Sequence, residues 1–430
     1  MFSLNVFIEI RGIQTKVGNL ICENNEAEFI YDADYLSSEY ARPISVSLPL
    51  GKKSFSHEET RTYFESLLPE GFSRKSVAGW AHVDEGDYIS LLMNLGRECI
   101  GAIQITEESE TIEGGYKPLS DQDLRSLARE GAVKSTELLM ESHISLAGAS
   151  GKVGLYYNRE NNTWYQPYGI AASTHIVKQS HVRLDNLVLN ERLCMLTASK
   201  LNIDVPKSFI INMGTGSDEE MLYAVERYDR VISDADNALK TPIRLHQEDF
   251  AQALGIPASK KYENENRNYL KSVFELINNY STNPIEDGLK LWDRIIFNYL
   301  IGNTDAHIKN YALLYSDDLS SIRLAPAYNM ICTSIYGSRN DMSIMINGEI
   351  DCTKLTRESF SLAAKSTHIG QKIAMEHYDY LKNNLENALK EAATELKAEG
   401  YENAIELSKR IISKTKGEQL QRQRMKSLGL

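Results

Sequence analysis

Apolar and polar residues alternate in short runs along the first part of the chain, and polar turns separate these runs. A period of two residues predicts β-strands. We expect strands at Asn5–Ile10, Lys16–Cys22, Ala27–Tyr31, Pro43–Leu50 and Ile100–Ile105. Helical spacing of apolar residues predicts helices at Glu58–Leu68 and Tyr88–Asn94. The pattern indicates a small α+β domain at the N-terminus.

The acidic stretch Glu107–Gly115 ends in two glycines and is typical of a linker, which places the end of this domain near residue 115. Ser120–Glu130 then predicts a short helix with Ser120 or Asp121 as its N-cap. The helical period dominates after residue 235. We expect helices there at Gln247–Leu254, Tyr269–Tyr280, Pro284–Leu300 and Tyr378–Glu399.

Composition narrows the class of protein. The chain has 430 residues, of which 42% are hydrophobic and 25% charged, as in ordinary globular proteins. The net charge of -12 argues against non-specific nucleic-acid binding by the whole surface. The five cysteines show no metal-ligand spacing and favour reduced thiols in a cytoplasmic protein. Because no apolar run is as long as a membrane span, we expect no membrane association.

Small residues dominate Ile144–Tyr157, which contains three glycines and Lys152 and leads into a strand. Small residues let backbone N–H groups approach phosphate oxygens, and a lysine adds a positive charge. The segment matches neither a Walker A loop nor the GxGxxG of typical protein kinases. A phosphate-binding loop and a plain glycine-rich hairpin both fit this pattern.

A second lysine ends the strand-like run Ser173–Lys178. The helix predicted next, Asp185–Lys200, carries Glu191 on its apolar stripe, where a carboxylate needs a partner. Lys178 is the natural candidate, because a strand lysine paired with a helix glutamate positions nucleotide phosphates in protein kinases. Alternatively, Glu191 lies at the edge of the stripe and reaches water.

Two further strands are predicted at Ser208–Asn212 and Leu222–Glu226. The second leads into Glu226–Arg230, where the hinge of a bilobal kinase would lie.

The apolar run Leu291–Leu300 gives way abruptly to a polar segment that contains Asp305, His307, Lys309 and Asn310. A carboxylate followed five positions later by an asparagine is the arrangement of a kinase catalytic loop, where the Asp orients the acceptor hydroxyl and the Asn binds a metal ion. Taken alone, the segment also fits a structural turn after a helix.

Eight motifs in the same order give the chain a resemblance to the HipA family, the kinase toxins of bacterial toxin–antitoxin pairs, over nearly its whole length. The motifs are Tyr40–Leu50, Phe64–Gly71, Gly96–Ala102, Ser145–Ala149, Ser173–Lys178, Glu226–Arg230, His246–Phe250 and Ile301–Asn310. The resemblance implies an α+β, bilobal kinase-like fold with a β-rich N-lobe, an extra N-terminal α+β subdomain and an all-helical C-lobe. We expect the corresponding domains at residues 1–115, 116–235 and 236–430.

The resemblance also implies a serine/threonine kinase that uses ATP and Mg²⁺. Family members phosphorylate aminoacyl-tRNA synthetases and are held inactive by HipB, a helix-turn-helix antitoxin that binds operator DNA. Carried over by position, catalysis is assigned to Asp305, Lys178 and His307, metal binding to Asn310 and residue 329, and autophosphorylation to Ser145. Nucleotide contacts are assigned to Ala147, Gly148, Ala149, Lys152, Lys178, Glu226, Tyr228 and Asp229.

One position departs from the family pattern. Where the family carries a second metal-binding aspartate, in a Pro-x-Tyr-Asp segment, this chain has Asn329. Mg²⁺ is a hard cation that is normally held by carboxylates and phosphates, so the loss of one charge should weaken its binding. We expect impaired phosphoryl transfer, as in a natural pseudokinase, a weak kinase or an engineered inactive variant.

Four functions therefore stay open from the sequence. A protein kinase fits the motifs, and a pseudokinase that binds a repressor and tunes transcription fits Asn329. A metal-dependent hydrolase that uses Asp305 and His307 lacks a further cluster of ligands at suitable spacing. A small-molecule kinase would share the same fold.

Overall fold

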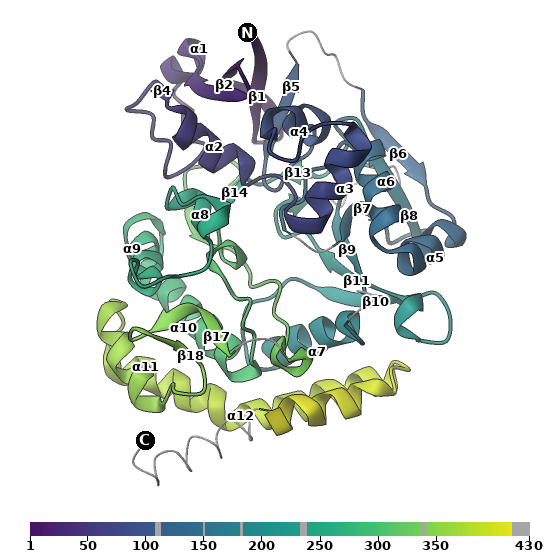
Figure 1. The fold of residues 1–430 in the computed structure, drawn as a ribbon, viewed down its shortest axis with the longest axis vertical. Coiled ribbons are helices and arrows are strands. Elements are labelled where there is room, and N and C mark those ends of the chain that lie inside the picture. Colours follow the sequence, from purple (N-terminus) through teal and green to yellow (C-terminus); the bar gives the residue numbers. More distant parts are fainter. Residues whose placement is uncertain (108–112, 149–150, 181–183, 233–238, 338–339, 415–430) are drawn as a thin grey trace. The chain divides into compact units, whose positions relative to one another are not determined.

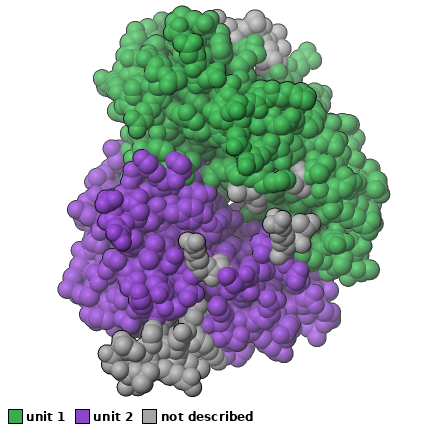
Figure 2. All heavy atoms as spheres, in the orientation of Figure 1, with its two compact units in different colours: residues 1–181, 211–258, 312–322 green, residues 182–210, 259–311, 323–430 purple. Residues whose placement is uncertain are grey.

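The computed structural model of the chain describes residues 1–107, 113–148, 151–180, 184–232, 239–337 and 340–414. Its residues form two compact units, which Figure 2 colours separately. Unit 1 comprises residues 1–181, 211–258 and 312–322, and unit 2 comprises residues 182–210, 259–311 and 323–430. Within the described part of the chain, no helix is long and apolar enough to cross a membrane.

The N-terminal part of unit 1 is an antiparallel five-stranded sheet with the strand order β4-β3-β2-β1-β5 and helices beside it (Figure 1). The sheet buries Leu4, Val6 and Ile8 completely. The strands are β1 (Phe2–Ile10), β2 (Ile13–Glu23), β3 (Glu26–Tyr31), β4 (Ser54–Phe55) and β5 (Ile103–Glu107). The helices are α1 (Ala33–Ser37), α2 (His57–Glu65), α3 (Gly71–Ala81) and α4 (Tyr88–Leu95). The first three predicted strands and both predicted helices are confirmed.

A second sheet follows, with the order β10-β11-β9-β7-β8-β6. Its strands are β6 (Gly115–Pro118), β7 (Lys152–Asn158), β8 (Thr163–Tyr168), β9 (His175–Gln179), β10 (Ser208–Asn212) and β11 (Met221–Glu226). Helices α5 (Asp121–Glu130) and α6 (Ala132–Ser142) precede β7, and η1 (Asp218–Glu220) precedes β11. Of the two N-caps expected for α5, Ser120 is the one observed, in a capping box with Asp123. Most of the predicted linker lies outside the described residues.

Small pairings complete unit 1. They are the pair β12 (Arg230–Val231) with β13 (Ile243–Arg244), and a three-stranded sheet with the order β14-β15-β16. Its strands are β14 (Gln247–Asp249), β15 (Ala312–Tyr315) and β16 (Ile322–Leu324), of which only Ile322 of β16 belongs to unit 1. Helix α8 (Phe250–Ala253) follows β14, and η2 (Ala258–Lys260) ends this stretch.

Unit 2 is mainly helical. Its helices are α7 (Leu187–Lys200), α9 (Tyr269–Tyr280), α10 (Pro284–Ile301), η3 (Ile308–Asn310), η4 (Ser334–Tyr336), α11 (Arg357–Ala363), η5 (Ala364–Ser366) and α12 (Gln371–Ala398), and residues 403–414 are also helical. Helix α12 packs against both α7 and α10 (Figure 1). Strands β17 (Asp341–Ile346) and β18 (Glu349–Asp351) form a hairpin in this unit. From the sequence we expected an all-helical C-lobe and did not predict this hairpin.

The prediction of a strand at Pro43–Leu50 was wrong, because residues 41–50 are irregular, with bends and turns and no strand. Side chains rather than a neighbouring strand satisfy the backbone here. The hydroxyl of Tyr31 donates to the carbonyl of Leu48 and accepts from the N–H of Ile44. Two prolines also remove donors that a β-ladder needs.

Two other predicted elements have different bounds. The strand expected from Ile100 begins only at Ile103, because Gly101 takes a positive φ of 76°. The helix expected from Gln247 begins only at Phe250. Residues 247–249 instead pair with β15, and Asp249 then caps α8.

A buried acid, Glu248, joins the irregular segment at residues 45–46 to strand β15. Its carboxylate accepts hydrogen bonds from the hydroxyls of Ser45 and Tyr315, both at 2.5 Å, and from the N–H of Val46 at 3.0 Å. Burial raises the pKa of Glu248 from its ordinary 4.5 to about 7. The folded state therefore holds this proton more tightly than the unfolded state does. The stability that this provides is complete below pH 4.5 and is lost as the pH rises through about 7.

We predict that Glu248→Gln reduces the fall in the free energy of unfolding between pH 5 and pH 8. The contribution of Glu248 to the slope of the unfolding free energy against pH should not exceed about 1.4 kcal/mol per pH unit. Urea denaturation at both pH values measures it. The exposed Glu58 provides the matched control, since Glu58→Gln should keep the parent's pH dependence. A Glu248→Gln curve parallel to the parent's would contradict the assignment.

Candidate functional site

Two lysines face the same side of the second sheet of unit 1. Lys152 in β7 and Lys178 in β9 are register partners, and Lys178 is also the partner of Tyr223 in β11. Partners across antiparallel strands share a face, where like charges opposite each other are destabilising. The Nζ atom of Lys178 lies 5.8 Å from the centre of the Tyr223 ring. Such a face suits a polyanion, because it carries two positive charges.

The small-residue segment before β7 folds close to one of these lysines. Gly148 has a φ of +108°, and a Cβ built there would lie 2.7 Å from the Nζ of Lys152. Glycine is therefore required both by the backbone conformation and by the close approach. Ala147 and Gly148 are half-buried, whereas Ala149 lies outside the residues that the structure describes.

Ser145, the predicted autophosphorylation site, is completely buried at the start of this segment. Its Oγ donates to the carbonyl of Leu67 at 2.7 Å, and its N–H donates to the carbonyl of Glu98 at 2.8 Å. A phosphate can reach this hydroxyl only after the segment has moved away from residue 67.

The predicted hinge follows β11. Glu226 forms an ion pair with Arg159, and the hydroxyl of Tyr228 donates to the side-chain oxygen of Gln247. The N–H of Arg227 donates to the carbonyl of Thr174 at 2.9 Å. The side chains of Glu226 and Tyr228 are thus engaged within unit 1, so the nucleotide contacts predicted for them would involve their backbone groups.

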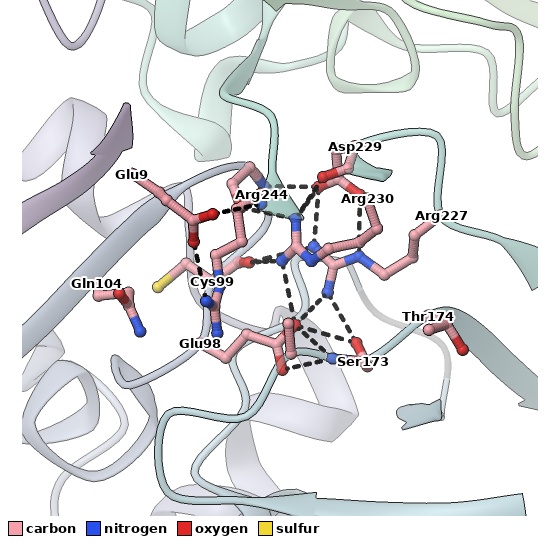
Figure 3. Close-up of polar contacts among 12 residues, drawn as sticks. Glu9, Glu98, Cys99, Gln104, Ser173, Thr174, Arg227, Asp229, Arg230 and Arg244 are labelled. Atoms are coloured by element: carbon pink, nitrogen blue, oxygen red, sulfur yellow. Dashed lines mark hydrogen bonds and ion pairs between the residues drawn. The ribbon is translucent and has the colours of Figure 1, made fainter. Parts of the chain in front are cut away.

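Next to the hinge lies a buried cluster of charges, shown in Figure 3. Glu98, which is fully buried, accepts from Nη1 of Arg227 at 2.9 Å and from Nη2 of Arg230 at 3.1 Å. The same carboxylate accepts from the N–H of Ser173 at 3.0 Å and from its hydroxyl at 3.1 Å. Glu98 thereby joins the hinge to the segment that leads into β9, while its own carbonyl holds Ser145.

Asp229 belongs to the same cluster. Its carboxylate accepts two hydrogen bonds from Arg227, at 2.8 and 2.9 Å, and one from the N–H of Gly101 at 2.8 Å. Burial opposes its ionisation, but the guanidinium groups of Arg227 and Arg230 lower the pKa of Asp229 well below its ordinary value. The Asp229 carboxylate is already hydrogen-bonded within the protein. A nucleotide contact from this residue would therefore have to come from its backbone.

The polar segment predicted to be a catalytic loop lies in unit 2, directly after α10. The helix ends at Gly302, whose φ is +73°, and a Cβ there would lie 2.3 Å from the Oγ of Ser334. The N–H of Thr304 donates to the Oγ1 of Thr333 at 2.8 Å. These contacts hold the start of the loop against residues 333–334.

Asp305 is half-buried, and its backbone is tied to the rest of the loop. Its carbonyl accepts from the N–H of His307 at 2.8 Å and from the side-chain amide of Asn310 at 2.7 Å. His307, to which a catalytic role was assigned, is buried, with 6% of its surface exposed. The spacing of five residues thus corresponds to a direct contact between Asp305 and Asn310.

Asn329 completes this group of side chains. Its Nδ2 donates to the Oδ1 of Asn310 at 3.1 Å, and its carbonyl accepts from the side chain of Asn303 at 3.3 Å. Its φ of +56° lies in the left-handed region, which asparagine tolerates better than most residues. The two positions that were predicted to bind metal are therefore adjacent, but an amide–amide hydrogen bond now joins them.

Comparison with known proteins identifies the family of the chain. Residues 144–410 match the model of the HipA-like C-terminal domain, and residues 8–106 match that of the HipA N-terminal domain. The chain belongs to the HipA family. It is 34% identical over 357 residues to the putative kinase Y4mE of Sinorhizobium fredii, an alignment that covers 80% of this chain and 81% of that protein.

A second HipA relative is named as a serine/threonine-protein kinase toxin. This protein, HipA of Shewanella oneidensis, is 26% identical over 356 residues, covering 79% of this chain and 77% of its own length. The structure of a complex of Shewanella oneidensis HipA, HipB and operator DNA contains a chain with the same fold, at a TM-score of 0.79 and 20% identity over 96% of both chains. The predicted α+β kinase-like fold is confirmed.

Several HipA assignments remain predictions. Lys178 belongs to unit 1, whereas Glu191, which is buried in α7, belongs to unit 2, so their ion pair is untested. The boundaries of three separate domains are untested as well, as are the roles of the individual site residues.

Sequence reasoning missed three features of the site. It did not predict that Lys152 and Lys178 lie opposite each other on adjacent strands. The sequence alone does not show which residues of two strands are paired. It included Glu98 only as part of a motif, and nothing local indicates that this residue meets Arg227. It also overlooked Tyr262, whose hydroxyl donates to the Oδ1 of Asp305.

We predict that Glu98→Gln lowers the free energy of unfolding by about 3–5 kcal/mol, because it leaves the two buried guanidinium groups of Arg227 and Arg230 to share the single carboxylate of Asp229. Ser173→Ala, which removes one hydroxyl and no charge, should cost only about 1 kcal/mol. Chemical denaturation measures both. Glu137→Gln, in a partly exposed pair with Lys134, serves as the control and should change stability by less than about 0.5 kcal/mol. Equal losses for Glu98 and Glu137 would contradict the role given to the cluster.

Proposed function

We propose that this chain is a HipA-type serine/threonine protein kinase whose phosphoryl transfer is weakened by Asn329. The observation that carries the proposal is the arrangement around Asp305. A carboxylate, an asparagine bonded to its backbone and residue 329 are grouped within unit 2 in the order that a kinase catalytic loop requires. The family relationship supports the use of a nucleotide.

In this proposal the acceptor hydroxyl donates its proton to the carboxylate of Asp305. The hydroxyl oxygen then attacks the γ-phosphorus of ATP, the bond to the β-phosphate oxygen breaks, and ADP leaves. Lys178 and Lys152 offset the charge of the phosphates, which is the task that their shared face suits. The backbone of residues 226–228 receives the adenine.

Mg²⁺ normally supplies further charge neutralisation in such a reaction. The residues here fit it poorly. Neither Asn310 nor Asn329 carries a negative charge, and the oxygen that Asn310 would offer already accepts a hydrogen bond from Asn329. We therefore assign no step of the reaction in this chain to the metal.

The same hydrogen bond favours one alternative function, that of a pseudokinase. The side-chain amides of Asn310 and Asn329 are neutral, and their hydrogen bond holds the two residues together without a metal ion. This arrangement suits a protein that acts by binding a partner. In that case the chain would bind an antitoxin and tune transcription without phosphoryl transfer. Transfer to a protein acceptor at a useful rate would exclude this alternative.

The partners that we propose follow the family. A HipB-like helix-turn-helix antitoxin would neutralise the chain and carry the contacts to operator DNA. The acceptor would be a protein serine or threonine, as in an aminoacyl-tRNA synthetase. Phosphorylation of Ser145 would regulate the kinase, and we place the protein in the cytoplasm. The burial of Ser145 implies that this phosphorylation requires the segment before β7 to open.

We predict that Asn329→Asp raises the phosphoryl-transfer rate by about two to four orders of magnitude, since metal coordination contributes several kcal/mol to transition-state stabilisation. Transfer from radiolabelled ATP in the presence of Mg²⁺ measures the rate. A variant with Asp at this position that remains inactive would overturn the proposed kinase activity.

A second measurement of this substitution does not depend on activity. Without metal, the new carboxylate would face the Oδ1 of Asn310, so the variant should melt at a lower temperature than the parent. Mg²⁺ at about a hundredfold excess over its dissociation constant should then stabilise the variant by about 2.7 kcal/mol. The parent's melting temperature should not respond to Mg²⁺, and Asn303→Asp, which lies outside the predicted metal positions, is the control.

A further inference from the structure

The carboxylate of Asp305 already accepts a hydrogen bond from a hydroxyl of this chain. The phenol of Tyr262 donates to the Oδ1 of Asp305 at 2.5 Å, and both residues belong to unit 2. In the proposed reaction an acceptor serine or threonine makes this same type of contact, from an O–H to the Asp305 carboxylate. Tyr262 thus takes the place of the acceptor hydroxyl.

The contact is built into the surroundings of Tyr262. Its ring packs edge-on against His307, with the ring centres 5.2 Å apart and the planes at 88°. The Nζ of Lys261 lies 5.5 Å from the centre of the Tyr262 ring. The ring is therefore held from the catalytic loop as well as by its own neighbour in sequence.

The backbone beside Tyr262 is anchored more firmly still. The N–H of Glu263 donates to the carbonyl of Ser343, and the carboxylate of Glu263 accepts from the N–H groups of Met345 and Tyr269, at 2.6 and 2.8 Å. The hydroxyl of Ser343 donates to the carbonyl of Thr304 at 2.7 Å. Strand β17 thus fixes residue 263 and residue 304 together, and the latter directly precedes Asp305.

We propose that Tyr262 is a specificity-determining residue, which occupies the acceptor position on Asp305 and must be displaced by the acceptor hydroxyl. The proposal rests on the kinase function proposed above. Because the backbone is anchored at residue 263, displacement requires only a rotation of the Tyr262 side chain. Tyr262 is 47% exposed, so its ring can turn toward solvent.

This arrangement lowers the apparent affinity for the acceptor and leaves ATP binding unaffected. An acceptor binds only the fraction of molecules in which Tyr262 has left Asp305, so its apparent dissociation constant rises in inverse proportion to that fraction. The net contribution of a typical hydrogen bond, applied to this partly exposed side chain, changes the acceptor affinity by about three- to tenfold. Only acceptors that contact the loop well enough to displace the phenol would be phosphorylated efficiently.

The test is Tyr262→Phe, which removes the hydroxyl and keeps the ring against His307. Phosphoryl transfer to casein is measured in the full chain that also carries Asn329→Asp. The KM for casein should fall about three- to tenfold, with the KM for ATP unchanged. The control is Tyr280→Phe in α9, a similarly exposed tyrosine at 45%, which should alter neither constant.

The outcomes separate this inference from the kinase assignment. If Tyr262→Phe lowers kcat and leaves the KM for casein unchanged, Tyr262 positions Asp305 and the inference is overturned. Unchanged kinetics would overturn it too. If the Asn329→Asp chain transfers no phosphate at all, the proposed function fails, and the inference with it.

Nitration of tyrosines checks the contact without kinase activity. Asp305→Ala removes the hydrogen-bond acceptor, and we expect tetranitromethane then to nitrate Tyr262 at least threefold faster relative to Tyr280. Site-specific nitration is quantified by peptide mass spectrometry. Equal relative rates in the two chains would show that the phenol does not rest on Asp305, and would overturn the inference.

Discussion

The geometry of residues 226–230 and of the approach to β9 in unit 1 depends on the ion pairs of Glu98. A carboxylate removed from water is costly unless charged and hydrogen-bonding partners surround it, and breaking one partner costs more than the pair itself contributes. Glu98 meets this condition with two guanidinium groups and Ser173. Because those partners come from the hinge and from the approach to β9, the constraint on one charge also fixes the relative positions of these segments.

The loop in unit 2 that contains Asp305 is held together in a different way. Its contacts are mostly between neutral groups: the side-chain amides of Asn303, Asn310 and Asn329, and the hydroxyls of Thr304 and Thr333. Neutral amides satisfy one another without a counter-ion, whereas a carboxylate at residue 329 would leave two oxygens facing each other. Asn329 therefore lets the loop hold together through neutral contacts, without a counter-ion.

Much of the fold was predictable because most elements follow local periodicity. Helices α9 and α10 and strands β9 and β11 lie where apolar spacing and caps place them. The segment from Pro43 to Leu50 was mispredicted because its apolar residues suggested a strand, although its backbone is satisfied by Tyr31 and Glu248 from distant parts of the sequence. The local pattern of apolar and polar residues does not reveal such distant hydrogen-bond partners.

The candidate site was predictable to a similar degree. Asp305 and Asn310 are five residues apart, so their contact can be anticipated from their spacing. Residue 329 was assigned to the site from the resemblance to the family. Tyr262 precedes Asp305 by more than forty residues, and only the anchoring of residue 263 to β17 brings the two together. Contacts that depend on tertiary structure of this kind carry no sequence signal that a single chain can supply.

The order in which the chain builds its units bears on its synthesis. Strand β14 of unit 1 pairs with β15, whose residues Ala312–Tyr315 come after more than two-thirds of the sequence. A ribosome releases the N-terminal residues first, yet unit 1 cannot complete its hydrogen bonding until this late segment has emerged. In a nascent chain, unit 1 thus stays incomplete until both the strands that carry Lys152 and Lys178 and the Asp305 loop have been synthesised. A product terminated before β15 would lack its C-terminal residues and would also leave unit 1 incompletely hydrogen-bonded.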